Sequence, residues 1–169
     1  MSERMTLSPA GNAFVRRVTH PILFRFWLML KLPSALFAGV SLKRIGADGC
    51  ETTMPFGWRS QNPFQSIYFA AQAMAAELST GALVLLAATD AGVPFSTLIV
   101  ELRATFGKKA NATTTFSCVS GAEIFAALAE ARSSGEARVI VVETVGRLPD
   151  GAEVSRFWFT WSVKARSAR

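Results

Sequence analysis

The chain has 169 residues, half of them hydrophobic, which is the usual size of one domain with a substantial core. Its net charge is +6, but the 18 basic residues are scattered rather than interleaved with aromatics, so we expect no nucleic-acid partner. Mean hydropathy is +0.30, yet every long apolar stretch is interrupted by charges, prolines or glutamines. We therefore expect one domain over residues 1–169 and no membrane-spanning helix.

The start of the chain is polar and lacks a basic stretch followed by an apolar run, so we expect no signal peptide and a cytoplasmic protein. Cys50 and Cys118 lie in separate strand-like segments without metal-ligand spacing, and no disulfide is expected between them. His20 is the only histidine, and no nucleophile motif accompanies it. We expect neither a metal site nor catalysis by this histidine.

The first predicted helix covers residues 12–32, because apolar side chains recur there at helical spacing while arginines lie off the stripe. Pro21 would kink or divide this helix, and Pro33 would end it. Residues 38–45 and 50–55 are predicted strands, joined into a hairpin by a Gly-Ala-Asp-Gly turn.

The next predicted helix is the longest, at about 63–80, with an apolar continuation that would extend it to residue 88. Pro63 suits the first helical position and Asn62 suits the N-cap. Glu77 is the only charged residue between Arg59 and Asp90, and small residues flank it on its own face. Partial burial would raise the pKa of this carboxyl. Two interpretations stay open: Glu77 belongs to a functional site, or it reaches solvent or caps buried backbone.

Four further strands and a short helix complete the chain. The strands are predicted at residues 95–106, 113–119, 138–145 and 154–164, and the short helix at residues 122–132. In the first of these strands one face is expected to hold Leu98, Val100, Leu102, Ala104 and Phe106, and the other Thr97, Glu101, Arg103 and Thr105. The element order predicts an α+β fold in which a curved antiparallel sheet of about six strands wraps the long helix.

At this point a resemblance is evident. The segment from Arg59 to Gly81, with its Asn62…Glu77…Gly81 spacing, resembles the central helix of hotdog-fold thioesterases. It is most similar to the DUF4442 branch, relatives of the PaaI-like acyl-CoA thioesterases, and the resemblance extends over residues 12–165. It implies a hotdog fold and a homodimer with sheets joined edge to edge and sites at the interface, with a tetramer also open. It further implies an acyl-CoA or acyl-carrier thioester as substrate, with no cofactor beyond the coenzyme A of the substrate itself.

The resemblance also assigns candidate residues. In PaaI-like enzymes an asparagine precedes the helix, a His-Gly or similar pair opens it, and an acid follows about two turns later. Asn62 and Glu77 match the asparagine and the acid as catalytic residues. The His-Gly position falls at Tyr68 and Phe69, which is a departure, because glycine lets a thioester approach the backbone. The Tyr68 hydroxyl could take the part of the histidine.

Two further pairs are implied as substrate-binding residues. Relatives use a Ser or Thr from the partner's strand after the helix, for which Ser96 and Thr97 are the candidates here. They bind coenzyme A phosphates with basic residues, for which Lys108 and Lys109 at a strand end are suited. A solvated surface pair remains the alternative for the two lysines.

Three functions therefore stay open. The first is thioester hydrolysis, with Asn62 and the Phe69 N–H polarising the carbonyl and Glu77 acting as general base or nucleophile. The second is non-catalytic binding of a fatty acyl group or another apolar ligand, which the departure at the His-Gly position favours. The third is peripheral attachment to a membrane, without stable insertion, through the apolar and basic first helix. The aromatic residues that suggest membrane attachment are Phe24, Phe26 and Trp27.

Overall fold

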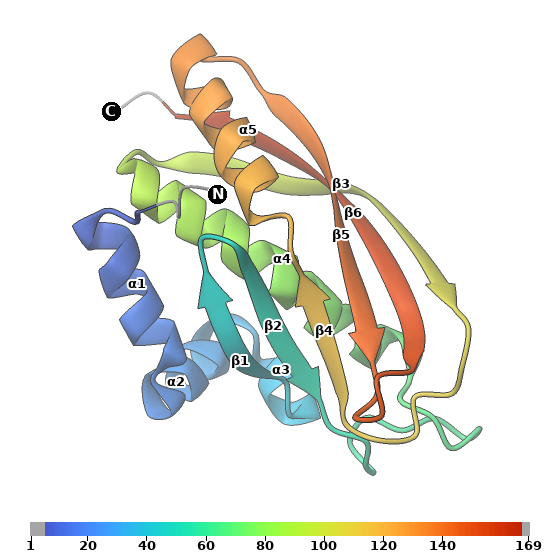
Figure 1. The fold of residues 1–169 in the computed structure, drawn as a ribbon. Helices are drawn as coiled ribbons and strands as arrows, with labels where there is room; N and C mark the ends of the chain where they lie inside the picture. Colours follow the sequence, from blue (N-terminus) through green and yellow to red (C-terminus); the bar gives the residue numbers. More distant parts are fainter. Residues whose placement is uncertain (1–5, 167–169) are drawn as a thin grey trace.

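A computed structural model describes residues 6–166 and contains one six-stranded antiparallel sheet on a long helix, α4 (Phe69–Ala91). The strands are β1 (Ser41–Gly46), β2 (Gly49–Met54), β3 (Phe95–Phe106), β4 (Thr114–Cys118), β5 (Arg138–Arg147) and β6 (Glu153–Ala165). They are ordered β1-β2-β4-β5-β6-β3. Figure 1 shows α4 running along one face of the twisted sheet, with α5 (Gly121–Ser134) beside it. The predicted α+β architecture is confirmed.

Three short helices precede the sheet: α1 (Pro9–Thr19), α2 (Pro21–Lys31) and α3 (Pro33–Ala38). Each begins with proline, which suits a first turn because its missing N–H would have no helical partner there. The predicted division at Pro21 is confirmed, and Pro33 ends α2 as expected but also opens α3. The strand predicted from Ala38 begins only at Ser41, because Ala38 still belongs to α3 and Gly39, with φ of 91°, ends that helix.

The start predicted for the central helix is wrong, because α4 begins at Phe69 rather than at Pro63. Asn62 is not its N-cap. The Asn62 Oδ1 instead accepts hydrogen bonds from the N–H groups of Phe64 and Ser66, at 3.0 and 3.2 Å. Gln65, within this turn, has a left-handed φ of 57°. The side chain thus stabilises a tight loop, the role in which asparagine competes with helix formation.

At its other end α4 continues past the predicted limit to Ala91, and Gly92 with φ of 69° ends it. By length and composition this helix could cross a membrane, but 67% of its most apolar 18-residue window is buried inside the fold. Strands of the sheet, α1, α3 and α5 all pack against it. Its apolar composition therefore has a structural cause, the core that it forms with the sheet.

The strand β3 forms one edge of the sheet and pairs with β6. A bulge at Val100 shifts the register, so the alternation predicted for this strand is wrong in its first half. Thr97 pairs with the buried Val163 and faces the helix, whereas Leu98 pairs with Ser162 and faces outward. A period-two pattern cannot show such an inserted residue. The bulge places the Thr97 side chain on the helix-facing side of the sheet, where it remains exposed.

Candidate functional site

The predicted site residues other than Ser96 are divided between two pockets at opposite ends of β3. The Asn62 pocket has a volume of about 620 Å³, and the Glu77 pocket has a volume of about 450 Å³. Phe106, the last residue of β3, lines the first pocket, and Thr97, near the start of the strand, lines the second. A single chain therefore does not bring Asn62 and Glu77 into one cavity.

The Asn62 pocket is built on the loop before α4. Since the Asn62 Oδ1 accepts two backbone N–H groups, the amide is oriented, and Nδ2 has no acceptor among residues 6–166. The loop is tied to the segment after β3: Ala110 N–H donates to Ser66 Oγ at 2.9 Å, and Ile67 N–H donates to the Ala110 carbonyl at 2.8 Å. The asparagine thus presents a fixed hydrogen-bond donor to the pocket.

The first turn of α4 opens toward the same pocket. The first backbone bond of this helix runs from Gln72 N–H to the Tyr68 carbonyl, at 3.0 Å. The N–H groups of Phe69, Ala70 and Ala71 have no backbone acceptor within the described part of the chain, as is usual at a helix N-terminus. Of these three residues Phe69 lines the same pocket as Asn62. Its N–H and the asparagine amide give that pocket a positive polarity, suited to a carbonyl oxygen on which negative charge develops.

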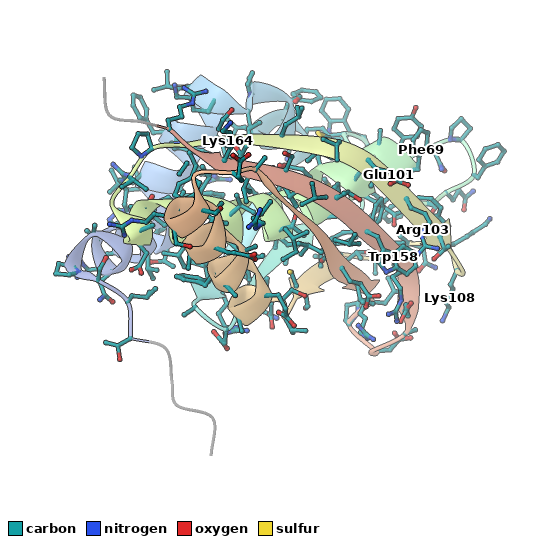
Figure 2. The ribbon with its side chains drawn as sticks, turned by 90° about the horizontal axis from the view of Figure 1, so that it is seen from above. Phe69, Glu101, Arg103, Lys108, Trp158 and Lys164 are labelled. Atoms are coloured by element: carbon teal, nitrogen blue, oxygen red, sulfur yellow. The ribbon has the colours of Figure 1, made fainter. Side chains whose placement is uncertain are left out.

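Aromatic rings and two cations border this surface. The Tyr68 and Phe69 rings meet edge to face with centroids 4.7 Å apart, and both are about half exposed. Lys108 and Lys109 follow the end of β3 and line the pocket, and neither forms an ion pair within residues 6–166. Figure 2 shows Phe69 and Lys108 at the same end of the molecule. The pocket therefore combines apolar walls with positive charge.

The Glu77 pocket lies between the N-terminal helices and α4. Glu77 is half-buried, as predicted, and this burial raises the pKa of its carboxyl. Neither a cation nor a hydrogen bond offsets the effect among the described residues. A carboxyl held in this way is a better proton acceptor near neutral pH than an exposed glutamate.

Gly81, Thr80 and Trp161 pack around Glu77. A Cβ at Gly81 would lie 2.7 Å from Glu77 Oε1. The carboxylate therefore occupies space that only a glycine at position 81 leaves free. Thr80 Oγ1 donates to the Glu77 carbonyl at 3.0 Å and accepts from Trp161 Nε1 at 3.1 Å. Trp161 is itself part of the pocket wall. The helix and β6 are thus locked together directly beside the carboxyl.

Of the two hydroxyl candidates after the helix, the structure brings only Thr97 to the Glu77 pocket. Ser96 is exposed on the other face of β3 and accepts a hydrogen bond from Arg166 Nη2 at 3.4 Å. Sequence reasoning missed Trp27 and Lys31, which α2 contributes to this pocket. No spacing or motif links α2 to α4, so no sequence signal could have indicated this contact.

Comparison with known proteins shows the fold. No family model and no curated protein matches the chain. Among solved structures, a candidate thioesterase from Shewanella oneidensis has 10% identity and a TM-score of 0.71, over 90% of this chain and 99% of its own. A probable thioesterase from Pseudomonas aeruginosa has 20% identity and a TM-score of 0.73, over 86% of this chain and 97% of its own. A thioesterase from Haemophilus influenzae has 15% identity and a TM-score of 0.58, over 81% of this chain and 86% of its own. The chain therefore has the hotdog fold, in common with these thioesterase-like structures.

Proposed function

We propose that the chain is a thioesterase for acyl-CoA or acyl-carrier thioesters, of the DUF4442 and PaaI-like type, that acts as a homodimer. Each site would combine the Asn62 pocket of one copy with the Glu77 pocket of the other. The observation that carries this proposal is the position of the two pockets at the two ends of one exposed edge strand, β3.

The edge strand is suited to pairing with a second copy. It is 12 residues long, and along it Leu98, Val100 and Leu102 are 64%, 53% and 49% exposed. Long apolar edges are normally covered, because free strand edges associate with other chains. If β3 pairs antiparallel with itself about a twofold axis near its middle, Phe106 of one copy lies near Thr97 of the other. The two half-sites then adjoin.

In such a site the chemistry can be assigned to residues. The Asn62 Nδ2 and the Phe69 N–H would polarise the thioester carbonyl and stabilise its developing charge. Glu77 of the other copy would take a proton from water, whose oxygen attacks the carbonyl carbon, or would attack that carbon itself to form an anhydride that water then cleaves. In both routes the carbon–sulfur bond breaks, the acid leaves, and the thiolate receives a proton.

The two pockets also suggest how the substrate is held. The Glu77 pocket is lined mostly by apolar side chains, among them Leu78, Val84 and Trp161, and suits an acyl chain. Lys108 and Lys109 at the rim of the Asn62 pocket suit the phosphates of coenzyme A or of a phosphopantetheine arm. The substrate would thus lie across the dimer interface.

Non-catalytic acyl binding is a second candidate, favoured by the aromatic side chain of Phe69 at the helix start where glycine would leave room. A panel of medium- and long-chain acyl-CoA substrates with a thiol reagent separates the two. We expect turnover by the wild type and a loss of at least about a hundredfold in Glu77→Gln, the scale expected when a general base is removed. Acyl-CoA binding without turnover of any substrate would instead indicate the binder.

A further inference from the structure

The helix α2 is apolar on both of its faces. Phe24 and Leu28 are 5% and 0% exposed and hold the helix against the core. The opposite face carries large side chains at helical spacing, and they remain exposed. This outward set, the α2 apolar face, consists of Ile22 (71% exposed), Leu23 (48%), Phe26 (56%), Met29 (50%) and Leu30 (62%). A helix with this pattern has a second surface that the chain itself does not bury.

The helix next to α2 also exposes an aromatic side chain. Helix α3 packs against α2, and its Phe37 is 58% exposed. Phe37 meets the Trp58 ring edge to face, with centroids 5.8 Å apart, and Trp58 is 76% exposed. Figure 1 shows α1, α2 and α3 gathered on one side of the molecule. The Trp58 ring combines an apolar body with a polar N–H, and side chains of this kind are typical of a membrane–water interface.

The segment that contains the three N-terminal helices is also basic. Residues 6–40 contain four Lys and Arg and no Asp or Glu. Arg16 and Arg17 in the last turn of α1, and Arg25 on α2, are exposed. Cations beside an exposed apolar face are complementary to anionic lipid headgroups, and each contributes to binding at low ionic strength.

We propose that the α2 apolar face docks reversibly on an anionic lipid bilayer, with α2 lying in the interface and the cations of α1 and α2 contacting the headgroups. Of the aromatic residues that suggested membrane attachment from sequence, only Phe26 belongs to the docking face. Phe24 is in the core, and Trp27 lines the Glu77 pocket. Docking does not depend on the proposed thioesterase activity. Because Trp27 and Lys31 join α2 to the Glu77 pocket, it would also bring that pocket close to lipid.

Flotation of the full chain with lipid vesicles tests the proposal. We expect binding to phosphatidylcholine vesicles that contain phosphatidylglycerol, weaker binding to phosphatidylcholine alone, and a decrease with added salt. The variant Phe26→Ser/Met29→Ser/Leu30→Ser removes three apolar side chains that no core contact requires. We expect it to bind at least about tenfold more weakly, because interfacial binding scales with the apolar area inserted. Arg16→Gln/Arg17→Gln should weaken binding to the anionic vesicles and leave the weak binding to phosphatidylcholine unchanged.

A matched control is Val139→Ser/Val141→Ser on β5, where the two valines are 65% and 61% exposed but lie outside the α2 apolar face. This control should bind like the wild type, and all variants should keep the wild-type melting temperature. Failure of the wild type to bind anionic vesicles at low salt would overturn the proposal. So would equal binding by the triple serine variant. Conversion of a wild-type dimer to a monomer by that variant would assign the face to a second copy of the chain instead.

Discussion

Burial of a single carboxyl, that of Glu77, makes stability depend on pH. Its pKa in the folded chain is raised above the usual value, so the protonated form is favoured by folding. The stabilisation is present at low pH and is lost as pH rises through the folded pKa, because the buried carboxylate then carries an uncompensated charge. Glu77→Gln keeps the size of the side chain without that charge. We expect its melting temperature to exceed that of the wild type at neutral pH, and the difference to vanish toward about pH 4.

Thermal unfolding of both proteins across this pH range measures the effect. Parallel curves for wild type and Glu77→Gln would show that the carboxyl is not desolvated. For a thioesterase, the same ionisation should also set the acidic limb of the pH–rate profile, since a general base acts only when deprotonated.

Gly81 controls the position of the Glu77 carboxylate. In Gly81→Ala the new methyl group would lie 2.7 Å from Glu77 Oε1, and the flexible glutamate would have to move, while Trp161 at 3.5 Å would stay in ordinary contact. Alanine favours a helix interior by up to about 1 kcal/mol over glycine. We expect unchanged or higher stability in denaturant and a reduced turnover. A double variant with Glu77→Gln should lose no more activity than Glu77→Gln alone, whereas additive losses would place the effect elsewhere.

From the sequence, the partial burial of Glu77 was predicted correctly, whereas the helix N-cap role predicted for Asn62 was wrong. Glu77 stood out because no other charge lies between Arg59 and Asp90, and its partial burial follows from that isolation. Asn62 before Pro63 carried every sign of a helix N-cap. In the structure the Asn62 side chain accepts hydrogen bonds from the backbone N–H groups two and four residues further on. These bonds stabilise a loop in place of the first helical turn. The same residue types serve both arrangements, so local sequence could not distinguish them.

The elements were predicted largely as they are, because turn residues and hydrophobic periods mark them. All six strands appear with ends displaced by a few residues at most, whereas the long helix begins at Phe69 instead of Pro63 and runs on to Ala91. The bulge at Val100 was invisible, since a bulge leaves no sign in a pattern of alternating residues. It also changes the lining of the Glu77 pocket, because the register shift directs Thr97 rather than Leu98 toward the helix.

Lys108 and Lys109, which follow the end of β3, are the residues proposed to recognise the substrate's phosphates. Lys108→Ala/Lys109→Ala should weaken binding of an acyl-CoA more than binding of the same acyl group on a short thiol, because the lysines would contact phosphates that only the first ligand has. Binding isotherms for the two ligands give the comparison. Arg16→Ala/Arg17→Ala removes the same charge from an exposed pair on α1 and should change neither affinity. Equal losses for both ligands would rule out phosphate contacts.

For the whole molecule, the separation of Asn62 from Glu77 is the main result that the sequence did not predict. Their spacing along the chain suggested a common site, but Asn62 lies in the loop before α4, whereas Glu77 lies about two turns into the helix and lines a different pocket. Only the topology reveals that β3 borders both pockets and forms an exposed edge. If copies pair along β3, light scattering should give about twice the 18.2 kDa chain mass. A species of single-chain mass alone would contradict that pairing.

Activity in a mixed dimer tests the shared site most directly. Asn62→Ala and Glu77→Gln chains, each inactive by itself, would be co-expressed with two different affinity tags, and the heterodimer isolated by both tags. If each site takes Asn62 from one copy and Glu77 from the other, one site contains both defects and the other is intact. The heterodimer should then recover about half of the wild-type turnover. If each site lies within one chain, both sites carry a defect, and a heterodimer as inactive as its parents would contradict the account.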